Sequence, residues 1–420
     1  MCSGRRNVRI SLLSVPFCLC GETPGYNILV LSSRLEFVPD DAFFSAIPAA
    51  PAVFLLRAAD SSSEPYVSKT ANLRRRLLRL LGAPIEGKRL NLRALVREIE
   101  YSPTGSDFES SFLLYRLLRL EYPKTYIDRL HLRFAPLIKL HLDNAYPRAS
   151  VTTRLGRLNG SALYYGPFPS RPAAEKFAND SLDFFKMRRC VDDLHPDPSF
   201  PGCIYSEMKM CLAPCFKACS DDEYRTEVTR VQEYFDSAGD ALVREISAQR
   251  DHASADLDFE NAAVLHARLE KVKPVSAQLP EIVHRLDRLS GLMIQKSVYP
   301  ESVTLFRIDR ACIAGPITFS THGGEHAKSQ SMESRLEECL GSAPASPAKT
   351  AAETMEHLAL LRRWYYRGHR AGEIFFADPR GELPIRRIVR GISRVYRGER
   401  PEGETVPATG IVSSLPSGSP

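Results

Sequence analysis

Cysteine is the residue type that most clearly carries chemistry in this chain. Five of its ten cysteines fall between Cys190 and Cys219, and four follow the spacing Cys190-x12-Cys203-x7-Cys211-x3-Cys215. Thiolates are soft ligands that suit zinc or an iron–sulfur cluster. The spacing therefore predicts one metal centre and leaves its metal open. Cys219 lies one helical turn past Cys215 and is an alternative ligand, although a bystander role is favoured. Buried free thiols are the remaining alternative.

Arginine clusters suggest a second kind of chemistry. Residues 362–400 hold eleven arginines and four acidic residues, with Trp364, Tyr365, Tyr366 and Tyr396 between them. Arginines and aromatic rings together suit phosphate contact and base stacking, although a solvated basic face is an equal alternative. A shorter basic run occurs near residue 75. The candidates for nucleic-acid contact are Arg74, Arg75, Arg76, Arg362, Arg363, Arg386 and Arg387.

The chain is expected to be helical from residue 221 to 273, with breaks near 237–239 and 256–258 and an end at Pro274. The last two helices form a pair, and the second of that pair begins in the run Leu257-Asp258-Phe259-Glu260-Asn261-Ala262-Ala263. Two helices cannot bury all their apolar faces alone, so an exposed apolar stripe predicts a partner. An ordinary internal hairpin is the alternative. The candidate partner-binding residues are Phe259, Ala262, Ala263 and Leu269.

Composition limits the classes of protein that could carry these residues. The chain has 420 residues, 44% of them hydrophobic, and a net charge of +6. Such values argue against wholesale disorder and against a small disulfide-stapled module. No apolar run approaches the ~18–20 residues that a membrane span needs. We therefore expect a cytoplasmic protein in a reducing compartment.

The elements that must position these residues follow from periodicity. Strands are expected near 52–56, 66–68, 96–101, 150–154 and 303–308, and helices near 72–82, 107–121, 173–185 and 351–366. They predict a multidomain α+β protein. The expected parts are a segment of unknown role at 1–49, a small α/β domain at 50–130, a cysteine-rich module at 131–220, a helical hairpin at 221–275, a basic region at 276–400 and a disordered tail at 401–420.

The order of these features resembles the UvrC family, a component of the bacterial excinuclease, over residues 50–274. Its GIY-YIG nuclease domain has Gly-Val-Tyr on one strand and Tyr-x-Gly-Lys on the next, where this chain has Ala52-Val53-Phe54 and Tyr66-Val67-Ser68-Lys69. Such nucleases use tyrosines and a basic residue to activate water, an arginine for the phosphate and a glutamate for one metal. Tyr66, Lys69 and Arg76 match this pattern.

The same resemblance shows where the pattern is lost. Phe54 lacks the tyrosine hydroxyl and Ser68 replaces the glycine. With Pro123 as anchor, the metal-binding glutamate falls on Leu114 and the family's asparagine on Tyr126. The expectation is a nuclease domain without a catalytic site and without catalytic Mg²⁺. The rival is an active endonuclease in which Glu109 or Glu121 supplies the carboxylate.

The resemblance has further implications for cofactor and partners. It implies a four-cysteine iron–sulfur site, 4Fe-4S, with zinc as the alternative, and identifies the hairpin with the UVR motif that contacts UvrB, another component of the excinuclease. Only about 145 residues follow Pro274, and they show no acidic set of the family's second, RNase-H-like nuclease. We therefore expect a truncated, degenerate relative that associates with DNA or scaffolds a repair complex. The third alternative is a metal-stapled protein-interaction module without a DNA role.

Overall fold

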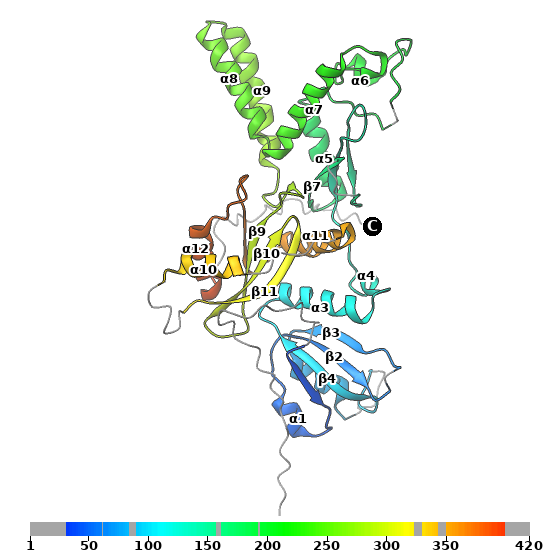
Figure 1. The fold of residues 1–420 in the computed structure, drawn as a ribbon, viewed down its shortest axis with the longest axis vertical. Coiled ribbons are helices and arrows are strands. Elements are labelled where there is room, and N and C mark those ends of the chain that lie inside the picture. Colours follow the sequence, from blue (N-terminus) through cyan, green and yellow to red (C-terminus); the bar gives the residue numbers. More distant parts are fainter. Residues whose placement is uncertain are drawn as a thin grey trace, which may run out of the picture.

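The computed structural model describes residues 31–60, 62–83, 90–156, 161–191, 194–322, 330–342 and 350–399. These residues form three four-stranded antiparallel sheets joined and covered by helices (Figure 1). The α+β class expected from the sequence is confirmed. The expected tail at 401–420 and the cysteines Cys2, Cys18 and Cys20 lie outside the described residues.

The first sheet has the strand order β1-β4-β2-β3. Its strands are β1 (Ser33–Glu36), β2 (Ala52–Ala58), β3 (Tyr66–Thr70) and β4 (Val96–Pro103), and its helices are α1 (Asp41–Ala46), α2 (Leu73–Leu81), α3 (Asp107–Glu121) and α4 (Tyr126–Arg129). The Asn72 side chain caps α2 and the Ser106 side chain caps α3. The strands expected near 52–56 and 66–68 and both longer helices are confirmed. Residues 33–46, for which no element was expected, add β1 and α1.

Side chains of successive strand residues point to opposite faces of this sheet. Phe54 and Leu56 of β2 join the core formed with α1 and α2. Val53 and Leu55 join a separate core, to which Leu117 of α3 belongs. The sheet is therefore covered on both faces.

The second sheet lies in the middle of the chain and has the order β6-β5-β7-β8. Its strands are β5 (Leu137–His141), β6 (Ala149–Thr152), β7 (Ala162–Gly166) and β8 (His284–Arg285), and the nearby helices are α5 (Arg171–Leu182), α6 (Ile204–Glu207), the 3₁₀ helix η1 (Pro214–Phe216) and α7 (Asp221–Asp236). Arg285 of β8 pairs with Tyr165 of β7. The chain thus returns to this sheet after the helical hairpin.

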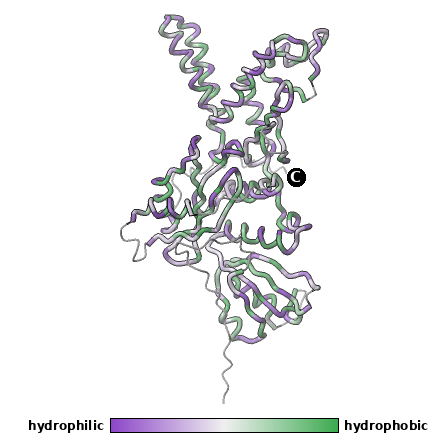
Figure 2. Tube along the Cα trace, in the orientation of Figure 1, coloured by the Kyte–Doolittle hydropathy of each residue, from purple (hydrophilic) through white to green (hydrophobic). Residues whose placement is uncertain are grey.

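Helices α8 (Asp240–Ala255) and α9 (Phe259–Ala277) form an antiparallel hairpin that projects as an arm (Figure 1). Hydrophobic and hydrophilic residues alternate along both helices of the arm (Figure 2). Gly239, at a φ of 94°, separates α7 from α8. Pro274 was expected to end the second helix, but it lies inside α9, which continues to Ala277. A proline this close to the end costs few backbone hydrogen bonds.

The third sheet has the order β11-β10-β9-β12. Its strands are β9 (Gly291–Lys296), β10 (Ser302–Asp309), β11 (Cys312–Ser320) and β12 (Glu373–Phe376), and its helices are α10 (Met332–Ser342), α11 (Ala351–Tyr365) and α12 (Ile385–Arg397). Helices α10 and α12 pack on one face. Residues of α11 and α3 pack on the other. Residues 291–397, expected only as a basic region with scattered elements, thus form a layered domain.

Helix α3 connects the first sheet to the third. Phe108 and Phe112 of α3 make ring contacts with Phe306 of β10, and Phe108 also contacts Trp364 of α11. None of the described helices is both long and apolar enough to cross a membrane.

Candidate metal centre and remnant nuclease site

The four cysteines with the metal-like spacing line one hollow. Cys190, Cys203, Cys211 and Cys215 all line one small hollow that is partly open to solvent. Ala213 and Lys217, on either side of η1, have left-handed backbone conformations that turn the chain sharply around Cys215. Sharp turns of this kind let cysteines that are close in sequence face one space. Cys219 instead packs against the main hydrophobic core.

Hydrogen-bond donors point at the sulfur atoms of this hollow. The backbone N–H of Ala213 donates to Cys211 Sγ over 3.3 Å, and Arg188 Nη1 donates to Cys190 Sγ over 3.4 Å. Burial raises the pKa of the Cys211 thiol to about 11, and the three other thiols add to this shift. Such donors stabilise sulfur that carries negative charge, as it does when it binds a metal.

The four cysteines line a common hollow without closing around a single metal position. In the part of the chain that the structure describes, no three His, Cys, Asp or Glu side chains stand close enough together to hold a single metal ion. A zinc ion holds four thiolates at about 2.3 Å, so their sulfur atoms must approach to about 4 Å of one another. The thiols would therefore have to move closer together to hold zinc, and the identity of the metal stays a prediction.

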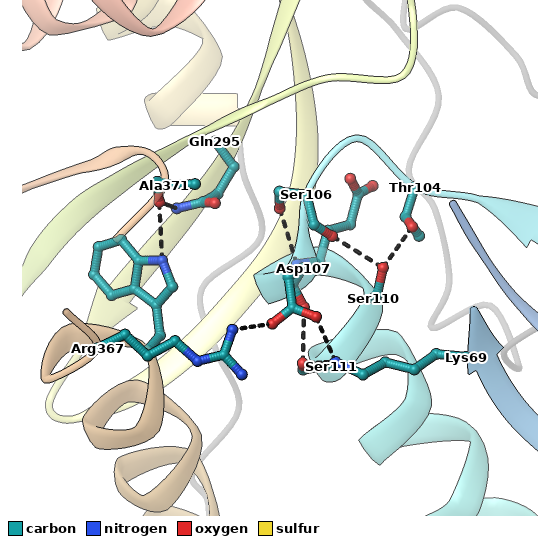
Figure 3. Close-up of polar contacts among 11 residues, drawn as sticks. Lys69, Thr104, Ser106, Asp107, Ser110, Ser111, Gln295, Arg367 and Ala371 are labelled. Carbon is teal, nitrogen blue, oxygen red and sulfur yellow. Dashed lines mark hydrogen bonds and ion pairs between the residues drawn. The ribbon is translucent and has the colours of Figure 1, made fainter. Parts of the chain in front are cut away.

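Of the three residues that match the nuclease pattern, two come together and the third lies apart. Arg76 Nη2 donates to the Tyr66 hydroxyl over 2.8 Å, on the α2 side of the sheet. Lys69 lies an odd number of residues from Tyr66 along β3, so its side chain points to the opposite face. There its Nζ contacts Asp107 Oδ1 at 2.6 Å and Ser111 Oγ at 2.8 Å (Figure 3). The structure therefore brings Tyr66 and Arg76 together and places Lys69 apart from them.

The degenerate positions are occupied by packing residues. Phe54 is fully buried beside the Tyr66 ring. Leu114 packs with the apolar core that contains Val53, Leu55 and Leu117. An apolar side chain there offers no oxygen to a hard cation.

The two remaining degenerate positions have polar contacts. The Tyr126 hydroxyl donates to Glu356 Oε1 of α11 over 2.6 Å, and Tyr115 donates to the other oxygen of that buried carboxylate over 2.7 Å. Tyr126 therefore helps to join the domain built on the first sheet to the domain built on the third sheet. We call these the first domain and the third domain. Ser68 donates to the backbone carbonyl of Lys69.

The two carboxylates considered as replacements are engaged elsewhere. Glu109 Oε2 accepts a hydrogen bond from the backbone N–H of Gly105 over 2.8 Å, at the start of α3. Burial raises the pKa of Glu109 to about 7, against the lowering effect of two backbone hydrogen bonds. Glu121 forms an ion pair with Arg57 at 2.7 Å. Both carboxylates thus have structural roles.

Three of the arginines expected to contact nucleic acid are used inside the fold. Arg74 donates to the carbonyls of Ile47 and Ser45. Arg362 donates to the carbonyls of Phe168 and Pro169, and Arg363 to those of Leu130 and His131. Arg74 and Arg362 thus use donors within the fold, and their contact with nucleic acid stays a prediction. Of the aromatic residues between the C-terminal arginines, Trp364 is buried. Arg75, Arg386 and Arg387 are exposed.

The hairpin presents apolar side chains near its tip. Leu257 is 73% exposed, Phe259 64% and Val264 67%. Ala262 is half-buried and Ala263 exposed. Leu269 is only 2% exposed and belongs to the main core at the base of the arm, so its expected role in partner binding is wrong. The residues predicted from the sequence did not include Leu257 and Val264, although both are large apolar residues near an expected helix break.

Comparisons with known proteins agree with the central part of this structure. The family described as UvrC/Cho excinuclease, middle domain, matches residues 135–234. UvrABC system protein C of Rickettsia africae is 28% identical over 249 residues, which cover 59% of this chain and 38% of the relative. The protein of the same name in Rickettsia canadensis is 28% identical over 265 residues, 63% of this chain and 41% of the relative. The matched part of this chain thus spans about two fifths of each relative. No solved structure matches.

Proposed function

Because the chain belongs to the UvrC family, we propose that it is a DNA-associated protein of nucleotide excision repair that does not itself cut DNA. One observation carries the second half of this proposal. Leu114, at the position of the family's metal-binding glutamate, packs in the apolar core with Val53, Leu55 and Leu117. Without a carboxylate, a divalent metal has no anchor at the centre, and metal-assisted attack on a phosphodiester loses its electrophile.

The contacts of Lys69 support the same conclusion. A group that activates water must be free to reach it. Here Lys69 Nζ is already engaged with Asp107 Oδ1 at 2.6 Å and with Ser111 Oγ at 2.8 Å. The active endonuclease remains the alternative that an incision assay must exclude. A protein-interaction module without DNA binding is the other.

We also propose that Cys190, Cys203, Cys211 and Cys215 hold an iron–sulfur cluster. Support comes from the shared hollow and from the donors of Ala213 and Arg188 that point at sulfur. When bound, such a cluster cross-links the chain and provides a centre able to exchange one electron. The four cysteines would tie the loops after α5 to the start of α7. Zinc remains the alternative.

The projecting arm is our candidate for partner binding. The relatives are named as components of the UvrABC system, and we propose that this chain contacts UvrB through the tip of α8 and α9. Leu257, Phe259 and Val264 supply exposed apolar area there. Exposed apolar side chains at the end of a polar arm are typical of a protein-binding surface. A cytoplasmic location belongs to the same proposal.

DNA binding over a salt series tests the proposed function. The purified full chain should bind a fluorescent duplex, with an affinity that falls steeply as salt rises, because phosphate contacts release counterions. It should leave the duplex uncut in Mg²⁺. A chain that binds no DNA at low salt would favour the interaction module instead.

A further inference from the structure

Four cationic side chains from three separate segments meet where the first domain adjoins the third. They are Lys69 of β3, Arg133 of the segment before β5, and Arg363 and Arg367 at the end of α11 and just after it; together we call them the cationic seam. Asp107 contacts two of them, with Oδ1 2.6 Å from Lys69 Nζ and Oδ2 2.5 Å from Arg367 Nη1 (Figure 3). The fold therefore assembles this charge from residues almost 300 positions apart.

The seam has more positive than negative charge. Partial burial lowers the pKa of Arg363, and repulsion from Arg367 and Arg133 lowers it further, with Asp107 acting in the opposite sense. Partial burial likewise lowers the pKa of Arg362, and repulsion from Arg133 and Arg363 adds to this lowering. Within the described ranges, neither Arg133 nor Arg363 forms an ion pair. Guanidinium groups stay protonated near neutral pH, so a bound anion would relieve the repulsion that Asp107 leaves.

Three of the four seam side chains, those of Lys69, Arg363 and Arg367, are held in place before any ligand arrives. Arg363 Nη2 donates to two backbone carbonyls, at 3.1 and 2.7 Å, and Asp107 fixes Arg367. Arg133, Arg363 and Arg367 remain exposed. Planar guanidinium groups in fixed orientations match the oxygens of a phosphate group, and their prior ordering reduces the entropy lost on binding.

We propose that the cationic seam binds phosphodiester groups of a DNA strand laid across the junction of the first and third domains. This inference rests on the proposed function, since it locates the surface that DNA would use. It also gives Asp107 a definite role. By neutralising Lys69 and Arg367 it competes with phosphate, so its removal should strengthen binding, whereas removal of a seam arginine should weaken it.

The test compares two variants that should change affinity in opposite directions. Arg133→Gln removes a charge for which the described residues offer no ion-pair partner, and Asp107→Asn removes the competing carboxylate. Arg244→Gln on the arm is the matched control, because it deletes the same charge from an exposed helix position. Each full chain is titrated into a fluorescent DNA duplex at salt concentrations from about 50 to about 200 mM, and circular dichroism verifies that each is folded.

We expect Arg133→Gln to weaken binding by roughly 10-fold at the lowest salt and to reduce the slope of log K against log salt by about 0.9, the value for one phosphate contact. Asp107→Asn should tighten binding several-fold, and Arg244→Gln should match the native chain. If native protein binds DNA and Arg133→Gln behaves like Arg244→Gln, the cationic seam is not the DNA-binding surface, while the proposed function stands. If native protein binds no DNA, both fall. Inorganic phosphate that binds the seam while DNA affinity is unchanged in all variants would also overturn the strand assignment.

Discussion

Glu109 should make the stability of this protein depend on pH in a way that one substitution removes. Its carboxylate caps the start of α3, next to the contact between the first and third domains, and burial raises its pKa from 4.5 to about 7. In the unfolded chain the pKa returns to 4.5. The folded state therefore binds a proton that the unfolded state has lost between these two values.

The sign and size follow from that difference. A folded pKa above the unfolded one gives stability that is fully present below about pH 4.5 and is lost as pH rises to about 7. At ~1.36 kcal/mol per pKa unit, the upper bound is about 3 kcal/mol. Since solvent reaches part of the side chain, we expect about 1–2 kcal/mol. Glu109→Gln removes the titration, so its stability relative to native protein should improve by that amount between pH 5 and pH 8.

Urea unfolding of both proteins at the two pH values measures this change. The difference between native and variant isolates Glu109, because every other titrating group is common to both. Any effect of the glutamine amide on the free energy of unfolding that does not depend on pH would appear at both pH values, and it cancels when the two pH values are compared. If the two proteins lose or gain stability in parallel from pH 5 to pH 8, the carboxyl is not protonated in the folded state and this account of the α3 cap is refuted.

Three other predictions concern the centre, the arm and the domain contact. Cys211→Ser should lose iron and acid-labile sulfide and unfold at a lower temperature, whereas Cys219→Ser should keep its metal and its stability. Native protein without metal, or Cys211→Ser with full metal, would contradict the proposed metal centre. Phe259→Ser should abolish binding to UvrB. It should change the free energy of unfolding by less than about 0.5 kcal/mol, because the side chain is 64% exposed. Unchanged binding would show that the tip of the arm is not the binding surface. Gly105→Ala should destabilise the folded protein by about 1–3 kcal/mol, because the new Cβ would lie 2.2 Å from the Lys296 carbonyl oxygen. Gly368→Ala has open space around it and should change stability little. Equal unfolding midpoints for the two variants would refute the close contact between Gly105 and Lys296.

Local signals in the sequence predicted many of the individual elements. The Asn72 cap, the leucine spacing that follows it and Gly82 define α2 at its observed bounds. Ser106 and Pro123 bracket α3 in the same way. Such signals act within a few residues, so they do not depend on the rest of the fold.

Roles that depend on tertiary contact could not be predicted in this way. Arg362 is in an arginine-rich run, yet its partners are carbonyls almost 200 residues earlier. Leu269 continues the hairpin's apolar stripe, but only the packed structure shows that this end of the stripe is buried. In contrast, the separation of Tyr66 from Lys69 follows from strand alternation and was available in the sequence. The spacing of Ile385, Ile388, Ile392 and Val395 likewise indicated α12.

Incision of DNA tests the central claim most directly. Supercoiled plasmid, with and without damage, is incubated with the purified native chain in Mg²⁺ or Mn²⁺ beside Arg76→Ala, and conversion to the nicked form is followed over time. Because Leu114 occupies the position of the metal-binding carboxylate and Lys69 is engaged with Asp107 and Ser111, the account predicts no nicking by either protein. Nicking by the native chain that disappears in Arg76→Ala would show a working nuclease centre and contradict it.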